Sequence, residues 1–433
     1  MIDAGKAELL FINARQIVTC AGLSAARRGA QMSDAGVVTG SAVAVRGDRI
    51  AAVGSQQTLE RDFADAQRID CSDCVITPGL VDSHTHAVFG RARYEEQEMR
   101  AAGVGYLEIA KRGGGIHFSV RDLRSRDEDE LFNLAVERIE RLASYGSTTV
   151  EIKSGYGLTV ADELKSLRVI SRLTQATRLR IVPTWLGAHE IPMEYRDSAT
   201  RRAEYVDLLI QEMLPEIVRV HLARFADVFC EPGVFTLDET RQILSAAQRA
   251  GLGLKMHADE LEPAGGAELA VELGASSADH LAAVSDSGIE ALGRSQTVAT
   301  LLPGTMFFLG RDRQAPARRL IEAGAAVALA TDFNPGTSPT VNFPLILTLG
   351  VSALRMTAAE VMVAATVNGA AALDLAGEVG QLAPGYSADI ALFECDDFRE
   401  IPYWYGDRRC KGTWARGIPC HPRARPDNLH PSR

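Results

Sequence analysis

Residues 76–86 read ITPGLVDSHTH, and this stretch decides how the rest of the chain is interpreted. An extended apolar segment, interrupted at Pro78-Gly79, runs into two histidines, His84 and His86. Side chains at positions i and i+2 of a strand point to the same face, so both imidazoles can converge on one metal ion. The end of a barrel strand lies at the barrel mouth, where barrel enzymes carry out their chemistry. The stretch therefore predicts a barrel strand that ends in paired metal ligands.

Three later strand-like runs end in the same kinds of residue. The runs GLKMH, AVALATD and SSADH close on His257, Asp332 and His280, respectively. A lone H-x-H pair is more often part of a surface turn, but the four endings together point to one shared metal site. Imidazole and carboxylate side chains form a normal ligand set for zinc or iron, with one position left open for water.

Length and composition exclude several classes of protein. The chain has 433 residues, which is long for one ordinary domain but fits a large barrel with an accessory domain. A net charge of −10 argues against binding to nucleic acid or to a membrane surface, because binding to phosphate groups requires a basic patch on the protein. We expect no secretory signal, since the N-terminus lacks a basic region followed by an apolar core, and no membrane span, since the sequence has no apolar run of about 18 residues. Seven cysteines, an odd number, suit a reducing compartment, so we expect a cytoplasmic protein.

The two ends of the chain read as short strands. Near the N-terminus, the apolar runs AVAV and IAAV flank Gly47-Asp48, which is a hairpin signal. Near the C-terminus, the run ADIALF follows the turn residues Pro384-Gly385. We expect residues 1–75 and 380–433 to form one small composite β-sandwich, with a disordered Pro- and Arg-rich tail after residue 420.

The middle of the chain, residues 76–379, alternates strand-like runs with amphipathic helical patterns, which is typical of a parallel sheet. The helical pattern is clearest after Asp127, which can cap a helix with Glu130 at the third position, and Gly146 ends it. Eight strands with interleaved helices close into a (β/α)₈ barrel. The expected strand ends lie near His86, Lys153, His189, Glu231, His257, His280, Pro303 and Asp332.

Two further motifs have weaker interpretations. Cys71 and Cys74 form a C-x-x-C that could be half a zinc site or a redox pair, but no second C-x-x-C follows and the pair lies in an apparent linker. The run Gly113-Gly114-Gly115 is not a phosphate loop, because no Gly-Lys-Ser/Thr follows it. We expect that run to form a loop over the barrel mouth.

The pattern of His-x-His on the first strand, His on the fifth and sixth and Asp on the eighth resembles the amidohydrolase superfamily. A composite β-sandwich beside the barrel is also typical of that superfamily. Its binuclear members use a carboxylated lysine, or sometimes a carboxylate, to bridge a second ion. Here the fourth strand ends in Cys230-Glu231 without a lysine, and Lys153 falls on the second strand. We therefore favour one zinc or iron ion, and keep Glu231 as a minority candidate for a bridging ligand.

Finer motifs narrow the resemblance to one branch of that superfamily. The matching stretches span nearly the whole barrel: HTHAVFGRAR, GGGI, EIKSGYGL, LGAHEIP, KMHADE, SADH, LLPGT and ATDFNPGT. The resemblance implies hydrolytic ring opening of 4-imidazolone-5-propanoate to N-formimidoyl-L-glutamate, a step of histidine degradation. A homodimer is a further expectation of the resemblance.

The candidate catalytic residues fit hydrolysis of a lactam ring. The metal, held by His84, His86, His257 and Asp332, would lower the pKa of bound water and polarise the ring carbonyl. Glu260 comes three residues after the His257 ligand, where it can move a proton between the attacking water and the ring nitrogen. His280 is expected to hydrogen-bond the hydroxide or the developing oxyanion.

The anionic tail of this small-molecule substrate requires a cation. Arg93, seven residues after His86, can clamp a carboxylate through two parallel hydrogen bonds, and Arg91 could exchange roles with it. The resemblance implies that six residues touch the substrate in addition to Glu260. These are Arg93, Tyr156, His189, Asn334, Gly336 and Thr337. Members of the branch often carry Ser where Thr337 stands, and the hydroxyl is retained.

Two alternatives stay open at this point. Within the superfamily, an aminohydrolase that deaminates a purine- or cytosine-like ring would use the same metal site. Outside enzymology, a barrel that has lost catalysis could serve as an assembly partner, but such relatives typically lose ligands. Every expected ligand is present here, and so is Glu260.

Overall fold

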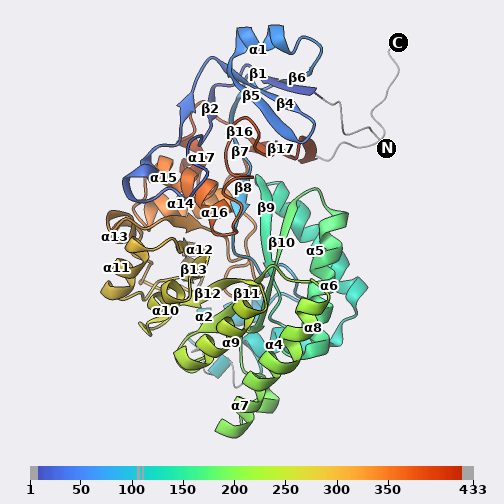
Figure 1. The fold of residues 1–433 in the computed structure, drawn as a ribbon, viewed down its shortest axis with the longest axis vertical. Coiled ribbons are helices and arrows are strands. Elements are labelled where there is room, and N and C mark those ends of the chain that lie inside the picture. The colour runs from blue at the N-terminus through green and yellow to red at the C-terminus, as the bar shows by residue number, and fades with distance from the viewer. Residues whose placement is uncertain (1–7, 105–107, 110–111, 422–433) are drawn as a thin grey trace.

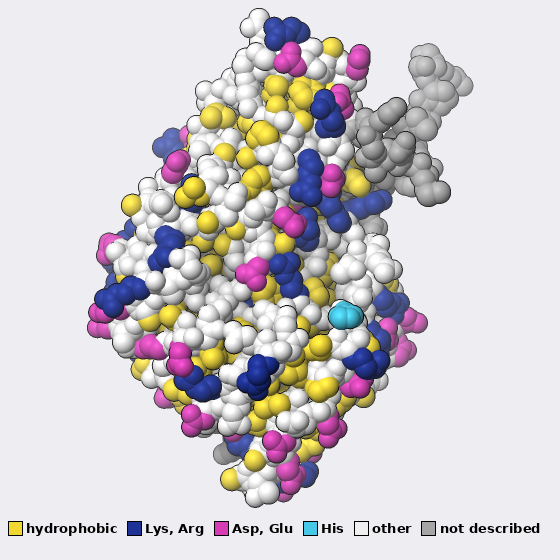
Figure 2. Space-filling view, viewed as in Figure 1, with side chains coloured by type: hydrophobic (Ala, Val, Ile, Leu, Met, Phe, Trp, Pro, Cys, Tyr) yellow, Lys and Arg dark blue, Asp and Glu magenta, His cyan; other side chains and the backbone are white. Residues whose placement is uncertain are grey.

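The computed structural model describes residues 8–104, 108–109 and 112–421. Figure 1 shows a barrel surrounded by helices, with a smaller lobe of sheets at one end that contains both ends of the described chain. Within these ranges, none of the helices combines the length and the apolar character that crossing a bilayer requires. Figure 2 shows side chains of both charge signs spread over the face in view.

The central sheet has eight strands in sequence order, β8 to β15, and each strand runs parallel to the next. This confirms the expected (β/α)₈ barrel. The strands are buried almost throughout, as parallel strands covered by helices on the outside and packed side chains on the inside must be. They are β8 (Leu80–Asp82), β9 (Ser147–Lys153), β10 (Arg180–Ala188), β11 (Phe225–Cys230), β12 (Gly253–Ala258), β13 (Ser277–His280), β14 (Val298–Leu301) and β15 (Val327–Leu329).

The barrel closes between its first and last strands just beyond their ends. The backbone N–H of Asp332 donates to the carbonyl of His84 at 3.0 Å, and that of His86 donates to the carbonyl of Phe333 at 2.8 Å. His84 and His86 therefore lie past the end of β8, in an extended segment that an isolated parallel bridge between Thr85 and Phe333 holds. The expected strand was too long at this point, but the extended conformation that pairs the two imidazoles is retained.

Two further sheets form the composite lobe. The four-stranded sheet has the order β5-β4-β1-β6, and the six-stranded sheet has the order β18-β17-β16-β7-β2-β3. Pairing of β7 with β16, in the register Ile76 to Leu392, joins the two ends of the chain in one sheet. One apolar cluster, which includes Phe11 and Ile390, packs the two sheets together. The strands are β1 (Glu8–Ile12), β2 (Gln16–Val18), β3 (Val37–Val38), β4 (Ser41–Arg46), β5 (Arg49–Ser55), β6 (Gln67–Asp70), β7 (Cys74–Pro78), β16 (Ile390–Glu394), β17 (Cys410–Ala415) and β18 (Ile418–His421).

The apolar segment before the histidine pair divides between the two lobes. Its first part is β7 of the composite sheet, and its second part is β8 of the barrel. Gly79 separates them, and a Cβ on this residue would lie 2.2 Å from Oγ1 of Thr148 in β9. The chain thus passes from one sheet to the other where only glycine fits, and the composite sheet extends to Pro78 instead of ending at residue 75.

Helices cover the outside of the barrel, and their ends follow the expected capping chemistry. The side chain of Asp127 accepts a hydrogen bond from the backbone N–H of Glu130 at 2.8 Å, as a helix N-cap does. In a capping box the Glu130 side chain would also accept a hydrogen bond from the backbone N–H of Asp127. Here the Glu130 carboxylate pairs with Arg126 instead. Gly146 follows the helix with φ +101°.

The helices flanking the barrel and the composite lobe are α1 (Gln56–Asp62), α2 (Tyr94–Ala101), α4 (Ile116–Ser125), α5 (Glu128–Ala143), α6 (Val160–Ala176), α7 (Ala199–Leu208), α8 (Leu214–Arg219), α9 (Leu237–Arg249), α10 (Gly266–Glu272), α11 (Asp286–Arg294), α12 (Pro303–Phe308), α13 (Ala317–Glu322), α14 (Phe343–Ser352), α15 (Ala358–Ala364), α16 (Val367–Ala371) and α17 (Glu400–Tyr403). Short helical turns are η1 (Gly29–Ser33), η2 (Met193–Tyr195) and η3 (Leu209–Met213).

Two regions of the chain correct details of the expectations. Cys71 and Cys74 are free thiols buried in the composite core, and Cys74 begins β7, so the pair does not lie in a linker. Burial raises the pKa of the Cys71 thiol to about 12, which makes it unreactive. His421 ends β18 and so does not belong to the tail that was expected after residue 420, and the rest of that expected tail, residues 422–433, lies outside the described residues.

Candidate active site

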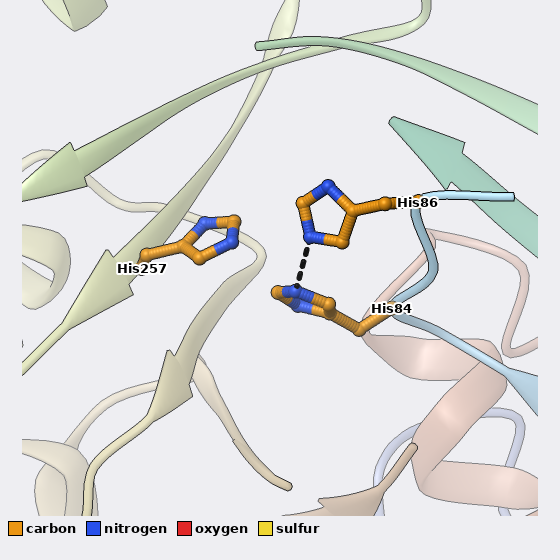
Figure 3. Close-up of side chains that lie close together, drawn as sticks. All are labelled: His84, His86 and His257. Carbon is orange, nitrogen blue, oxygen red and sulfur yellow. Dashed lines mark hydrogen bonds between the residues drawn. The ribbon is translucent and has the colours of Figure 1, made fainter. Parts of the chain in front are cut away.

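Two histidines from the end of β8 form the centre of the site. Nε2 of His84 lies 3.3 Å from Nε2 of His86, and both side chains are buried (Figure 3). His257 reaches toward them from β12, with its ring centroid 4.5 Å from that of His84. One nitrogen from each of these three rings lies within 4.8 Å of the other two. Residues 84, 86 and 257, distant in the sequence, thus point their imidazoles at a common point.

Asp332 completes this cluster from the segment after β15. Its Oδ1 atom lies 3.5 Å from Nε2 of both His84 and His86. His84, His280 and Asp332 form a second, overlapping group of close ligand atoms. The structure therefore brings together the four expected metal ligands, with His280 beside them.

The chemistry of these groups fits a metal ion. Burial is the largest cause that lowers the pKa of His84, His86 and His280 well below the ordinary value, so the imidazoles are neutral. Neutral imidazole is the form that binds metal, and uncharged rings next to a carboxylate suit a cation of the zinc or iron type.

A carboxylate behind the cluster orients the first histidine. Nδ1 of His84 lies 2.6 Å from Oδ2 of Asp279, and both side chains have no solvent exposure. This contact directs Nε2 of His84 toward the metal cluster, as a supporting carboxylate does for a metal-bound histidine. Asp227 of β11 supports His257 similarly, with Oδ2 at 3.0 Å from Nδ1 and Oδ1 accepting from the His257 backbone N–H at 3.1 Å.

Two lysines stand between these carboxylates in the barrel interior. Nζ of Lys153 lies 2.8 Å from Asp227 and 2.9 Å from Glu151, and Nζ of Lys255 lies 3.7 Å from Asp279. Burial alone would lower the pKa of Lys153, but Asp227, Glu151 and Asp279 together raise it. Lys153 is therefore held as an ammonium group. Sequence reasoning missed Asp227 and Asp279, although charged residues inside otherwise apolar strands were the available signal.

Glu260 lies beside His280 at the rim of the cluster. Its Oε2 atom is 3.6 Å from Nδ1 of His280. Burial, followed by the charges of Asp332 and Glu231, raises the pKa of Glu260 to about 8. A carboxyl group with a pKa near neutrality can both accept and donate a proton, which a general acid/base requires. His280 and Asp332 also adopt positive φ angles, 77° and 50°, a strained backbone that is typical of functional sites.

Glu231 holds the loop that carries Glu260. Its carboxylate accepts hydrogen bonds from the backbone N–H groups of Glu260, Leu261 and Glu262 at 3.0, 3.3 and 2.8 Å. Among the described residues, none of the clusters that could hold a metal includes Glu231. These hydrogen bonds give the Glu231 side chain a role in positioning the loop.

Arg93 is a buried guanidinium that forms an ion pair with Glu96, with Nε 3.5 Å from Oε1. Among the described residues, its one side-chain hydrogen bond runs from Nη1 to Ser119 Oγ at 3.5 Å, and its Nε has none. Burial is the largest cause of the pKa shifts of Tyr156 and His189, and the charge of Arg93 contributes to both, opposing the rise at Tyr156 and adding to the fall at His189. Arg93 therefore lies within electrostatic reach of the site. Arg91, by contrast, lies at the surface and pairs with Glu95.

Tyr156 and His189 form an aromatic wall next to the cluster. The His189 ring stacks on His86 with centroids 5.1 Å apart, and the Tyr156 ring lies 5.4 Å from His189. Burial, with a contribution from His257, lowers the pKa of His189 to about 3, so this ring is neutral. Burial raises the pKa of the Tyr156 hydroxyl, which therefore stays protonated and can donate a hydrogen bond.

The turn after Asp332 is organised by Asn334. Its Oδ1 atom accepts from the backbone N–H groups of Gly336 and Thr337 at 2.9 and 2.7 Å, and its Nδ2 donates to the Asp332 carbonyl at 2.7 Å. A Cβ on Gly336 would lie 1.4 Å from Nη2 of Arg93, so the arginine packs directly on this glycine. The Asn334 side chain thus shapes the turn that supports Arg93.

A cluster of buried histidines and an aspartate at the mouth of a parallel barrel, with a carboxyl group poised for proton transfer, defines a metal-dependent hydrolase of the amidohydrolase type. The model of the amidohydrolase family matches residues 75–418, and that of the bacterial imidazolonepropionase-like composite domain matches residues 42–66. The chain belongs to the amidohydrolase family and, within it, to the imidazolonepropionases. Both the family and the cluster indicate a bound metal ion.

Full-length relatives support the narrower assignment. Imidazolonepropionases from Geobacillus kaustophilus (strain HTA426) and Symbiobacterium thermophilum are each 47% identical to this chain over 403 residues, covering 92% of it and 94% of each relative. Solved structures with a similar fold include a triazine hydrolase variant (TM-score 0.71, 18% identity, 95% and 94% of the two chains). An adenosine deaminase from Xanthomonas campestris with bound zinc is similar too (TM-score 0.68, 16% identity, 96% and 93%). At these identities the structural matches establish the fold alone.

Proposed function

We propose that this protein hydrolyses 4-imidazolone-5-propanoate to N-formimidoyl-L-glutamate in histidine degradation. The proposal rests on Arg93, a buried guanidinium beside Tyr156 and His189 whose Nε lies 3.5 Å from Glu96 and whose Nη1 donates to Ser119. A guanidinium has five N–H donors and can bind a carboxylate through two parallel hydrogen bonds, so further donors remain for an anion. A substrate with a carboxylate tail supplies that anion, and the identity to imidazolonepropionases supports the same substrate.

One zinc or iron ion, held by His84, His86, His257 and Asp332, fits the cluster. When bound, the ion supplies Lewis acidity, which favours deprotonation of water and polarises the carbonyl group of the ring. Lys153, as an ammonium group paired with Asp227 and Glu151, is not available as a carboxylated bridge for a second ion. This pairing supports a single ion.

Glu260 carries the proton through the reaction. Its carboxylate takes one proton from the attacking water as the new C–O bond forms at the ring carbonyl carbon. The ring C–N bond then breaks, and Glu260 delivers the proton to the leaving nitrogen. The overall reaction adds one water molecule and releases nothing. In the metal-free site, burial and the charges of Asp332 and Glu231 raise the pKa of Glu260 to about 8.

The remaining residues bind and orient the substrate. Arg93 pairs with the propanoate carboxylate, while the Tyr156 hydroxyl donates to a polar atom of the substrate. His189 has Nδ1 in contact with the Gly155 carbonyl at 2.9 Å, which leaves Nε2 for the substrate. We assign His280 to the oxyanion that develops at the ring carbonyl, and backbone groups of Gly336 and Thr337 to the tail.

A cytoplasmic setting is the final part of the proposal. The seven cysteines are free, and six of them are buried. Free thiols suit a reducing compartment. We also expect a homodimer, which the molecular mass in solution would check.

Discrimination between the acid substrate and its neutral carboxamide tests the proposal. Metal-loaded protein should remove the absorbance of 4-imidazolone-5-propanoate, and Arg93→Met should reduce kcat/KM for the acid by about one to two decades, because one charge-assisted pair is lost. The same substitution should have a much smaller effect on the carboxamide, which cannot form the pair. Equal losses would give Arg93 a structural role, and absence of turnover by the metal-loaded protein would refute the proposed activity.

The runner-up activity, deamination of a purine- or cytosine-like ring, predicts ammonia release from such rings. A barrel that serves only as an assembly partner predicts no turnover of either class. Both assays can be run on the same metal-loaded preparation, with Glu260→Gln as the matched inactive control.

A further inference from the structure

Arg93 belongs to a cluster of three charged side chains on and before α2. Nε of Arg93 lies 3.5 Å from Oε1 of Glu96, and Nη1 of Arg100 lies 3.7 Å from Oε2 of the same carboxylate. Glu96 is buried, and its carboxylate lies close to both guanidinium groups. Its Oε1 also accepts the backbone N–H of Gly115 at 2.7 Å, which fixes the carboxylate in this position.

The charges in this cluster determine how much positive potential reaches the substrate tail. Arg93 and Glu96 alone would cancel, and a substrate carboxylate would meet a neutral pair. Arg100 adds a second positive charge, so the three side chains carry a net charge of +1. In a partly buried site a change in net charge from 0 to +1 is weakly screened by solvent. It therefore changes the binding energy of an anion more than the same change would at the surface.

The Arg100 side chain packs against neighbouring segments of the barrel mouth. Its Nη2 donates to the Gly336 carbonyl at 3.4 Å, and its guanidinium carbon lies 5.6 Å from the centre of the Phe308 ring. These contacts attach α2 to the turn on which Arg93 packs and to α12. The side chain is therefore placed to act through Glu96 and Arg93.

We infer that Arg100 is a specificity-determining positioning residue: it engages the Glu96 carboxylate and so keeps the charge of Arg93 available for the substrate carboxylate. The inference rests on the proposed function and deepens it, because it assigns the preference for an anionic tail to three residues instead of one. Selectivity for acid over amide then depends on the balance of charge among Arg93, Glu96 and Arg100.

Binding of a five-membered lactam that carries a propanoate, and of its carboxamide, tests the inference by calorimetry without requiring turnover. Arg100→Met should weaken binding of the acid by about 5- to 30-fold, since the tail then meets a neutral pair. It should change binding of the amide by less than about twofold. Arg100→Lys retains the charge and should retain most of the acid affinity, which separates loss of charge from loss of fold.

The double variant Glu96→Gln/Arg100→Met gives the sharpest outcome. It restores the net charge of +1, and the Gln oxygen can still accept the Gly115 N–H, so affinity for the acid should recover toward the wild-type value. A purely structural role of Arg100 predicts no recovery. In an Arg93→Met background, Arg100→Met should cause little further loss, because its effect passes through Arg93.

Arg294→Met is the matched control. Arg294 forms the same type of pair with Glu290, four residues earlier, on the exposed side of α11. Equal effects of Arg100→Met on acid and amide, or no recovery in the double variant, would overturn the inference. Acid selectivity that depends on Arg100 in a protein without ring-opening activity would instead refute the proposed function alone.

Discussion

Oδ2 of Asp279 lies 2.6 Å from Nδ1 of His84, and the two side chains are wholly buried. The contact joins β13 to the end of β8 across the barrel interior. It requires Nδ1 to carry the proton, which leaves the lone pair of Nε2 directed at His86, His257 and Asp332. The metal cluster therefore depends on a residue that is not one of its ligands.

Asp279→Asn should lower metal affinity by about 10- to 100-fold while leaving the barrel folded, as expected for loss of a supporting carboxylate. Competition with a chromophoric chelator measures the affinity directly, and circular dichroism checks the fold. Asp286→Asn, which changes an exposed aspartate at the start of α11, is the control. Unchanged affinity in Asp279→Asn would show that the contact does not orient His84.

Glu260→Gln should keep the metal and bind substrate normally, but lose most of the rate. A positioned acid/base supplies about 10²–10⁴-fold, and the amide is nearly isosteric with the carboxylate. Steady-state kinetics with metal content measured on the same sample test this expectation. The assigned roles would be wrong if Glu260→Gln lost its metal while Asp332→Asn kept both metal and activity.

The raised pKa of Glu260 has a consequence for the stability of the metal-free protein. In the unfolded chain this carboxyl ionises near its ordinary pKa, whereas burial and the charges of Asp332 and Glu231 raise the folded value to about 8. Between about pH 4.5 and 8 the folded state holds a proton that the unfolded state has released, so this group lowers stability as pH rises. Chelator-treated Glu260→Gln should thus gain stability relative to wild type across this range. Denaturant unfolding at pH 5 and at pH 8.5 measures the difference in the free energy of unfolding between Glu260→Gln and wild type. The same difference at both pH values would contradict the raised pKa of Glu260.

Gly336→Ala should reproduce much of the effect of Arg93→Met. The added Cβ would lie 1.4 Å from Nη2 and 2.1 Å from Cζ of Arg93, so the guanidinium must move away. We expect kcat/KM for the acid substrate to fall by about one to two decades, the worth of one charge-assisted pair. Gly377→Ala, where nothing lies within 4 Å of the new Cβ, should have no effect. Normal kinetics in Gly336→Ala would show that the position of Arg93 is not critical.

Several parts of this site could be predicted from local sequence patterns. The two-residue spacing of His84 and His86, and the strand-like runs that end at His257 and Asp332, identify the metal cluster because parallel barrel strands end at one mouth. The role of Glu231 could not be predicted in this way. Its three backbone hydrogen bonds reach a loop about thirty residues later, and only the three-dimensional path of that loop reveals them.

The network behind the ligands was also beyond sequence reasoning. Lys153, Asp227 and Asp279 lie on β9, β11 and β13, and their contacts cross the barrel instead of following the chain. The division of the apolar run around Gly79 between two sheets could not be predicted either, because the hydrophobic pattern continues from one strand into the next. Such features depend on which strands face one another, and short-range patterns do not encode it.

Hydrolysis of 4-imidazolone-5-propanoate in ¹⁸O-labelled water distinguishes ring opening at the carbonyl carbon from every other outcome. We expect a single product, N-formimidoyl-L-glutamate, with one ¹⁸O atom in the carboxylate formed from the ring carbonyl, both ring nitrogens retained and no ammonia released. Mass spectrometry of the product after reaction with metal-loaded protein measures this, and Glu260→Gln serves as the slow control. Release of ammonia with the ring intact, or no reaction at all, would refute the proposed ring opening.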